Sequence, residues 1–162
     1  MAKVYLETSF FSACVWDRDS PQHIYWQRQS RQWWVHQRAK YELFVSAEVL
    51  RELSFEGFRN RDDALALSTQ AALLEINEDV RGLAKVLVHE KVMPGPEDAG
   101  DAVHVAAATV HSMDFLLTWN QKHLANRNKI PHLREVCRRA GFVPPEMTTP
   151  ESLWMPSQES ES

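Results

Sequence analysis

Short runs of β-prone residues alternate with longer segments of helical periodicity along this chain, and that alternation narrows its fold more than any other feature. Strands are predicted at residues 3–6, 42–46, 74–77 and 115–118. Helical periodicity predicts helices over residues 22–40, 47–55, 61–73, 78–91, 98–112, 121–126 and 130–140. Strands separated by helices form parallel sheets that are covered on both faces. The sequence therefore predicts an α/β fold, a three-layer α/β/α sandwich around a mostly parallel central sheet.

The segment 98–112 differs from the other predicted helices because it is apolar around most of its circumference. After Asp101 it consists almost entirely of Ala, Val, His and Thr. A helix that is hydrophobic on all sides is normally buried. We therefore expect this helix to lie in the core.

The size of the chain indicates one domain. It has 162 residues, of which 44% are hydrophobic and 25% charged, values that are ordinary for a globular domain. This length suits one domain with a short tail and is too short for two full domains. We assign residues 1–147 to the domain. Residues 148–162 are polar and rich in Pro, Ser and Glu, and they are predicted to form a flexible tail.

Charge and cysteine content exclude several classes of protein. The chain has 18 basic and 22 acidic residues, and three of the acids fall in residues 151–162, so the rest of the chain is nearly neutral. This balance of charges excludes a nucleic-acid-binding surface that is basic throughout, but it allows local basic patches. The two cysteines, Cys14 and Cys137, lie far apart and have no zinc-site spacing. Neither a disulfide scaffold nor a structural zinc site is expected.

No targeting or membrane-spanning segment is predicted. The N-terminal residues MAKVYLETS lack the apolar region of a signal peptide, and no run approaches about 18 apolar residues. We therefore expect a protein of the reducing cytoplasm that has no membrane partner.

Polar side chains accompany the ends of three predicted strands. Glu7 comes directly after the first strand, Thr118 and Asn120 end the last one, and the helix after the second strand carries Glu52. In open parallel sheets, ligands bind outside the carboxyl ends of the strands. We expect these side chains to share one site.

Glu7 and Asp101 are the acids that the sequence indicates most strongly as functional, because both are embedded in apolar sequence. Burying a lone carboxylate is costly, so each needs a partner, a metal ion or an open cleft. Asp98 and His104 lie three residues before and after Asp101, on the same helix face. Converging carboxylates repel one another unless a cation compensates, and oxygen ligands favour Mg²⁺ or Mn²⁺. Because such ions activate water for displacement at phosphorus, the predicted chemistry is metal-dependent hydrolysis of phosphodiester bonds.

Three stretches of sequence carry a resemblance to a known family. The runs VYLETSFFS, ELFVSAEVLREL and DAGDAVHVAAATVHSMDFLLTWNQKHLAN occur in this order, and the resemblance covers roughly residues 3–148. Together they resemble the PIN domain, in particular the VapC-type toxin ribonucleases. The resemblance implies an α/β/α fold, three or four acids that bind Mg²⁺ or Mn²⁺, cleavage of RNA, neutralisation by a cognate antitoxin, and a homodimer.

The family pattern also implies roles for individual residues. Glu7 matches the acid after the first strand, Glu52 the acid in the helix after the second strand, and Asp101 the acid that opens the buried helix. These three would hold the metal ion. Thr118 matches the hydroxyl of the family's Thr-x-Asp/Asn motif, and together with Asn120 it would orient the attacking water or the acids.

Two positions depart from the usual PIN pattern. Glu7 stands where most members have Asp, and Asn120 stands where many have a fourth acid. Asn can coordinate through its carbonyl oxygen but adds no charge. Asp98 is the candidate fourth metal-binding carboxylate, with capping of the buried helix as the equal alternative. Glu48 is expected to face solvent.

The sequence thus predicts a Mg²⁺- or Mn²⁺-dependent endoribonuclease, the toxin of a toxin–antitoxin pair. The alternative is a PIN-like protein that is catalytically weak or inactive and binds RNA or a partner protein, as the departures at Glu7 and Asn120 suggest. A phosphatase-like or receiver-like domain also clusters acids, but it has an acid pair after the first strand, where this chain has Thr8 and Ser9. Thr8 and Ser9 are instead predicted to cap the following helix.

Each of the other candidate RNA contacts can be interpreted in two ways. Trp26, Trp33 and Trp34 are predicted as core or dimer contacts, with stacking on single-stranded bases as the alternative. A basic cluster near the site segment fits a phosphate-binding track and an ordinary solvated helix face equally well. It consists of Lys122, Arg127, Lys129, Arg134, Arg138 and Arg139. His104 and His123 are predicted to be structural or surface residues, with contact to substrate or metal as the less favoured alternative.

Overall fold

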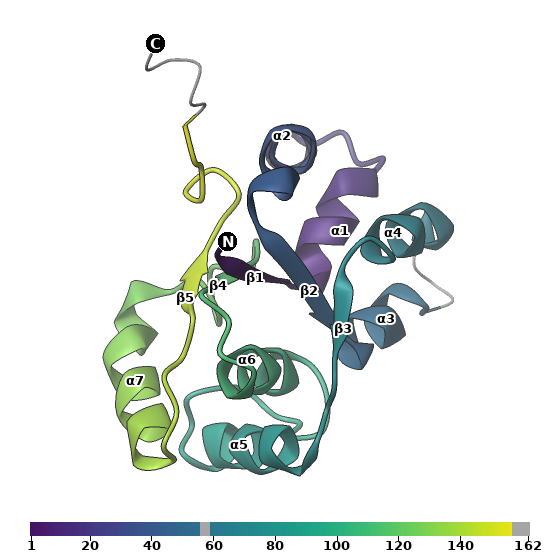
Figure 1. The fold of residues 1–162 in the computed structure, drawn as a ribbon. Coiled ribbons are helices and arrows are strands. Elements are labelled where there is room, and N and C mark those ends of the chain that lie inside the picture. The colour runs from purple at the N-terminus through teal and green to yellow at the C-terminus, as the bar shows by residue number, and fades with distance from the viewer. Residues whose placement is uncertain (56–58, 157–162) are drawn as a thin grey trace.

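Five parallel strands form the sheet in this computed structural model, which describes residues 1–55 and 59–156. The strands are β1 (Lys3–Leu6), β2 (Glu42–Ser46), β3 (Ala72–Leu74), β4 (Phe115–Leu117) and β5 (Glu146–Thr148). They lie in the order β3-β2-β1-β4-β5, and every neighbouring pair is parallel (Figure 1). The predicted parallel sheet is confirmed, but β3 lies at residues 72–74 rather than 74–77, because the helix predicted over 61–73 already ends at Ser68. β5 is a strand that the sequence pattern did not predict.

The helices form two layers, one on each side of the sheet (Figure 1). The first layer consists of α1 (Thr8–Val15), α2 (Pro21–Gln37), α3 (Ala47–Leu53) and α4 (Arg61–Ser68). The second consists of α5 (Glu78–His89), α6 (Asp101–Val110) and α7 (Ile130–Arg139). Two short 3₁₀ helices, η1 (Arg38–Lys40) and η2 (Arg127–Lys129), follow α2 and precede α7. The predicted three-layer α/β/α architecture is confirmed. Within the described residues, no helix has the length and apolar character needed to cross a membrane.

The order of the strands reverses beside β1. The chain runs from β1 through α1 and α2 to β2, and then to β3, whereas α5 and α6 carry it back to β4 on the other side of β1. Leu6 lies in register with Leu117, and the Glu7 amide donates to the Leu117 carbonyl oxygen at 3.1 Å. Open parallel sheets bind their ligands at such a reversal. The residues that follow β1 and β4 therefore lie where this topology places a site.

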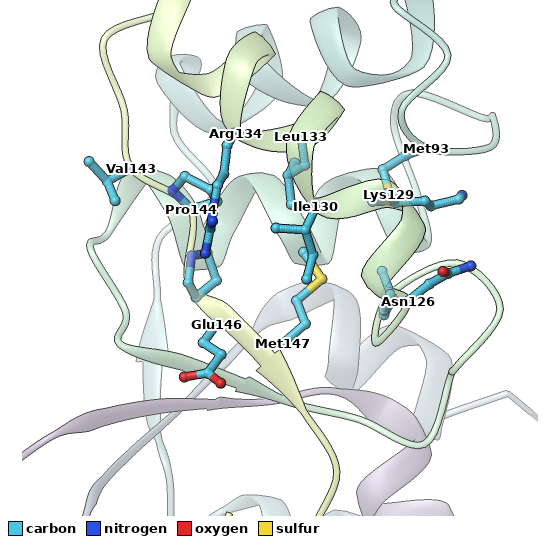
Figure 2. Close-up of a pocket in the computed structure, with 12 residues that line it drawn as sticks. Met93, Asn126, Lys129, Ile130, Leu133, Arg134, Val143, Pro144, Glu146 and Met147 are labelled. Atoms are coloured by element: carbon cyan, nitrogen blue, oxygen red, sulfur yellow. The ribbon is translucent and has the colours of Figure 1, made fainter. Parts of the chain in front are cut away.

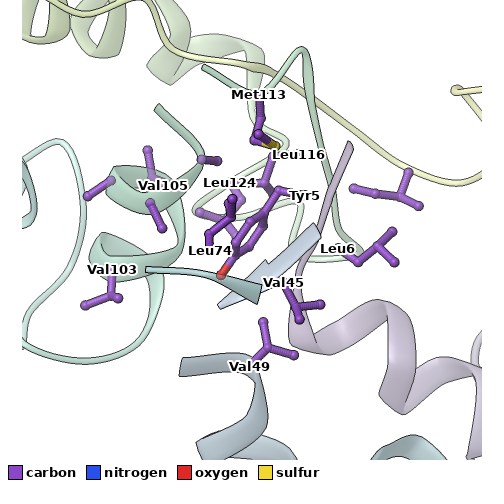
Figure 3. Packing of buried hydrophobic residues seen from close by; sticks show 14 of the residues in the cluster. Tyr5, Leu6, Val45, Val49, Leu74, Val103, Val105, Met113, Leu116 and Leu124 are labelled. Atoms are coloured by element: carbon purple, nitrogen blue, oxygen red, sulfur yellow. The ribbon is translucent and has the colours of Figure 1, made fainter. Parts of the chain in front are cut away.

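The core explains why β1 and α6 are so apolar. Residues 4–6 of β1 are fully buried, because a parallel strand in the middle of the sheet has helices over both faces. In α6, residues 102–109 are all buried, which confirms the predicted core helix. Figure 3 shows the Tyr5 ring packed among these apolar side chains, near Leu74 and Leu116.

Residues 121–126, predicted as a helix, form turns instead. The side-chain oxygen of Asn120 accepts from the His123 amide at 3.0 Å, and its carbonyl oxygen accepts from the amides of Leu124 and Ala125 at 3.2 and 2.8 Å. The Leu124 bond closes one helical turn, but the amides of Ala125 and Asn126 bond the carbonyl oxygens of Asn120 and Leu124, which are not the i−4 partners of a continuing α-helix. After β4, regular helical structure therefore begins only with η2.

The predicted C-terminal tail packs against α2 as far as the structure describes it. Its first residue belongs to β5, and Leu153 is buried. The Leu153 carbonyl oxygen accepts from Trp33 Nε1 at 2.8 Å, and the Gln37 side chain bonds the amide and the carbonyl of Met155 at 2.7 and 3.0 Å. The buried Leu153 side chain and the hydrogen bonds with Trp33 and Gln37 of α2 thus hold this segment in place. Residues 157–162 of the predicted tail lie outside the described residues.

Candidate active site

Glu7 follows β1 directly and is held by donors from two parts of the chain. Its Oε2 accepts from the Ser9 amide at 2.9 Å, so Glu7 caps α1 in place of the predicted Thr8 and Ser9. Its Oε1 accepts from the hydroxyls of Ser9 at 2.8 Å and Thr118 at 2.6 Å. Because Glu7 is 6% exposed, these bonds replace the water that the carboxylate has lost. The Glu7 carboxylate is therefore fixed before any ligand arrives.

Glu52 reaches the same place from α3. Its Oε1 accepts from Thr8 Oγ1 at 2.6 Å and from His104 Nε2 at 2.5 Å, while the side chain remains 31% exposed. Burial by itself raises the pKa of Glu52. The hydrogen bond and charge of His104, together with the bond from Thr8, outweigh burial and lower that pKa below its ordinary value. Glu52 is therefore a carboxylate at neutral pH.

His104 is the buried partner of Glu52, a role that sequence reasoning missed. It is 1% exposed, and its Nδ1 forms a hydrogen bond of 2.7 Å with the Tyr5 hydroxyl, which bonds Ser46 Oγ at 2.7 Å in turn. Burial lowers the pKa of His104, but the bond to Glu52 and the charges of nearby glutamates outweigh burial and raise it. The available signal was its spacing of three residues from Asp101 on one helix face.

The carboxylates of Glu7 and Glu52 and the ring of His104 form one cluster. One ligand atom from each residue lies within 4.8 Å of the other two. Both nitrogens of His104 are already hydrogen-bonded, and both hydrogen bonds to Glu52 fall on Oε1. Of the four oxygens on these two carboxylates, Glu52 Oε2 is therefore the one that accepts no hydrogen bond in the described structure, while both Glu7 oxygens already accept at least one. Two converging carboxylates with an open oxygen fit a hard divalent cation such as Mg²⁺ or Mn²⁺.

Asp101 is connected to this cluster through Asn120. Asp101 is the first residue of α6, and Asn120 Nδ2 donates to its Oδ1 and Oδ2 at 3.4 Å each. The backbone amide of Asn120 donates to Thr118 Oγ1 at 2.9 Å, and the Thr118 hydroxyl donates to Glu7 Oε1. One chain of hydrogen bonds thus joins four of the predicted site residues. In the described structure Asp101 is not one of the three residues of the tight cluster.

Asp98 lies outside the tight cluster, and it does not occupy the first turn of α6 where the capping role was predicted. It is exposed, precedes α6 instead of occupying the first turn, and lines a surface hollow with Lys85 and Glu97. Gly100 is the N-cap of α6 and has φ 75° and ψ −145°, a conformation that suits glycine. The chain turns at this glycine, so the helix begins at Asp101 and leaves Asp98 in the preceding turns.

Glu48 is buried rather than facing solvent as predicted. It is 4% exposed, and Arg51 donates to its two carboxylate oxygens at 2.6 and 2.9 Å. The Gly100 amide also donates to Glu48. Glu48 therefore anchors the turn that leads into Asp101. The sequence did not reveal this contact because Gly100 lies 52 positions further along the chain.

The tryptophans of α2 divide into two groups. Trp33 and Trp34 are buried in the core, as predicted. Trp26 is partly buried and stacks on Trp119, with ring centroids 5.3 Å apart and an angle of 16°. Trp119 Nε1 also donates to Ser30 Oγ of α2 at 2.7 Å, so the pair packs α2 against the segment that follows β4.

Four residues of the basic cluster make different kinds of contact. Arg138 and Arg139 pair with Glu135, which is typical of a solvated helix face. Lys129 instead donates to the Val92 carbonyl oxygen at 3.3 Å. Lys129 also lines, with Arg134 and neighbouring apolar side chains, a pocket between α7 and β5 (Figure 2). This pocket does not include the acidic residues of the candidate active site.

Comparison with known proteins identifies the type of fold. No family model and no curated protein matches the sequence. Among solved structures, the chain is similar to VapC20 of Mycobacterium tuberculosis, described as a toxin that cleaves the sarcin–ricin loop. The match has a TM-score of 0.56 and 18% sequence identity, and it covers 88% of this chain and 99% of that one. At this identity the likeness concerns the fold. The chain has the PIN fold, as its sequence resemblance predicted.

Proposed function

We propose that this protein is a Mg²⁺- or Mn²⁺-dependent endoribonuclease and the toxin of a toxin–antitoxin pair. The observation that carries the proposal is the convergence of the Glu7 and Glu52 carboxylates beside the reversal of strand order. RNA as the substrate is supported by the PIN fold and by the likeness to VapC20, a toxin described as cleaving the sarcin–ricin loop. A cognate antitoxin and a homodimer belong to the proposal through the family resemblance.

Glu7, Glu52 and Asp101 are the residues that would hold the cation. A bound Mg²⁺ or Mn²⁺ supplies an activated water and stabilises the charge that develops at phosphorus. The protein's own contribution is to fix the acids in advance, since Thr118 holds Glu7 and Asn120 holds Asp101. Groups that are already oriented need no reorganisation during the reaction.

The test compares cleavage of a mixed RNA pool by the wild type and Asp101→Asn in Mn²⁺, Mg²⁺ or EDTA, with sequencing of the products. Asp101→Asn removes one carboxylate charge while keeping the shape of the side chain. We expect metal-dependent cleavage by the wild type and its loss in the variant. Asp62→Asn is the matched control, because Asp62 lies in the first turn of α4 with its side chain 96% exposed. Equal cleavage by all three proteins contradicts the assignment of Asp101.

A second candidate function is RNA binding without cleavage. It is favoured by Asn120, which occupies the position of a fourth acid, and by the indirect connection of Asp101 to the cluster. Retention of RNA on the folded wild-type protein with no product in either metal would support this function. The same experiment therefore separates the two candidates.

A further inference from the structure

We propose that His104 is a positioning residue of the candidate active site, one that holds the Glu52 carboxylate beside Glu7 in the orientation that receives a divalent cation. This inference rests on the proposed function. It assigns to His104 neither contact with substrate nor coordination of the metal.

The hydrogen bonds of His104 define its part in the site. A carboxylate only accepts hydrogen bonds, so Nε2 of His104 carries the proton in its 2.5 Å contact with Glu52 Oε1. The other nitrogen, Nδ1, is bonded to the Tyr5 hydroxyl at 2.7 Å. With both nitrogens occupied, the ring offers no lone pair to a cation, although it lies within the 4.8 Å cluster. His104 thus acts on the site through Glu52.

The frame behind His104 is rigid. Tyr5 lies in β1, Ser46 ends β2, and His104 lies in α6, and all three are between 0% and 1% exposed. The Tyr5 hydroxyl bonds both of the other two side chains at 2.7 Å. The ring of His104 therefore cannot turn without opening the core.

Glu52 is the most exposed member of this arrangement. It lies on α3 with 31% of its side chain exposed, in contrast to the nearly buried Glu7. The second donor to Glu52 is the Thr8 hydroxyl at 2.6 Å, which binds the same oxygen as His104. Without His104, one hydroxyl would restrain a half-exposed side chain with several rotamers. Partners that orient a metal ligand commonly change metal affinity by about 10–100-fold when they are removed.

Two substitutions separate the contact with Glu52 from the contact with Tyr5. In His104→Gln, the side-chain amide nitrogen lies near the position of Nε2 and can still donate to Glu52. In His104→Asn, the shorter amide lies near Nδ1, so it can bond Tyr5 but does not reach Glu52. Both variants place a neutral polar side chain at the same buried position. If the role of His104 were purely structural, both variants would therefore change Mn²⁺ affinity to a similar extent.

The experiment measures Mn²⁺ affinity by titration calorimetry for the wild type and both variants, with unfolding in urea as a check of folding. We expect Mn²⁺ affinity to fall about tenfold or more in His104→Asn and to stay within about threefold of wild type in His104→Gln. Thr109→Val is the matched control. Thr109 lies on the same buried helix, and its hydroxyl has no hydrogen-bond partner in the described structure, so this variant should bind Mn²⁺ like the wild type.

A signal in the metal-free protein provides a second readout. In ¹⁵N-labelled protein, the Nε2 proton of His104 should give a hydrogen-bonded imidazole resonance, identified by its loss in His104→Gln. We expect that resonance to move in Glu52→Gln and to stay unchanged in Thr109→Val. If the resonance does not shift in Glu52→Gln, the inference is overturned.

The outcomes distinguish the inference from the proposed function. If the wild type binds Mn²⁺ and cleaves RNA while both His104 variants match its affinity, the inference fails and the function stands. If the wild type binds Mn²⁺ without cleaving RNA and the Asn variant alone loses affinity, the function fails and the inference stands. If the folded wild type binds no Mn²⁺, both fail.

Discussion

Uncharged hydrogen-bond donors hold the Glu7 carboxylate at the centre of the candidate site. Glu7 is bonded by the hydroxyls of Ser9 and Thr118 and by a backbone amide. Hydroxyl and amide donors stabilise the carboxylate without cancelling its charge. The charge therefore remains available to a cation, whereas a lysine or arginine at the same place would neutralise it.

Thr118→Val tests the importance of this support. The substitution keeps the shape of a fully buried side chain but removes the donor to Glu7 and the acceptor for the Asn120 amide. We expect a loss of about 1–3 kcal/mol in unfolding free energy, measured with urea. Thr109→Val is the control and should cost much less, since its hydroxyl has no partner in the described structure. Equal losses in the two variants would refute this account of Thr118.

The Glu52–His104 pair predicts how stability depends on pH in the metal-free protein. The pKa of Glu52 is lowered in the folded state, so its contribution is lost as the pH falls through that pKa. The pKa of His104 is raised, so its contribution is complete below its ordinary pKa and is lost as the pH rises through the folded value. Both contributions are complete between about pH 4.3 and pH 6.5.

We therefore expect the wild type to exceed His104→Gln in unfolding free energy most strongly within that pH window, and less on both sides of it. Urea unfolding in EDTA at a series of pH values measures the difference. A difference that is constant from pH 4 to pH 9 would mean that the pair does not titrate as described.

At the scale of elements, the sequence predicted what depends on local pattern and missed what depends on distant partners. The buried helix α6 was predictable because it is apolar on all sides. The turns after Asn120 were not, since the amides of Ala125 and Asn126 bond carbonyl oxygens other than those that a continuing helix would use. That Glu7, Thr118 and Asn120 lie close together was predictable because they follow neighbouring strands, whereas the contact between Glu48 and Gly100 joins segments far apart in the sequence.

Two glycine substitutions test the turn that places Asp101. Gly100 has φ 75° and ψ −145°, so Gly100→Ala should lose about 1–3 kcal/mol through backbone strain, although nothing lies within 4 Å of the new methyl group. Gly82 lies inside α5 with equally open space, and Gly82→Ala should gain about 0.5–1 kcal/mol. Thermal or urea unfolding measures both changes. Equal effects in the two variants would show that the Gly100 conformation does not matter.

At the scale of the whole molecule, topology brings the site together. The reversal of strand order places the residues after β1 and β4 side by side, and α6 returns Asp101 to the same edge of the sheet. The likeness to VapC20 at 18% identity shows that the fold tolerates extensive change of sequence. Such a fold depends on the burial pattern more than on particular residues.

The packing of the C-terminal segment is also a property of the whole molecule. Leu153 is 7% exposed and belongs to the core cluster, so Leu153→Ala should lose about 2 kcal/mol or more in unfolding free energy. Met155→Ala is the control, because the Met155 side chain is 41% exposed and Gln37 binds its backbone. It should change stability by about 0.5 kcal/mol or less. If Leu153→Ala were equally mild, residues after β5 would contribute little to the fold.

The acids after β1 and in α3 and α6 are proposed to form a metal-dependent ribonuclease site. The most direct test is to incubate the wild type with RNA in EDTA, add excess Mn²⁺, and follow the products with time, beside Asp101→Asn treated identically. We predict that the wild type is inactive in EDTA, that Mn²⁺ restores cleavage, and that Asp101→Asn stays inactive. Cleavage that persists in EDTA, or that Asp101→Asn carries out at the wild-type rate, would contradict the account.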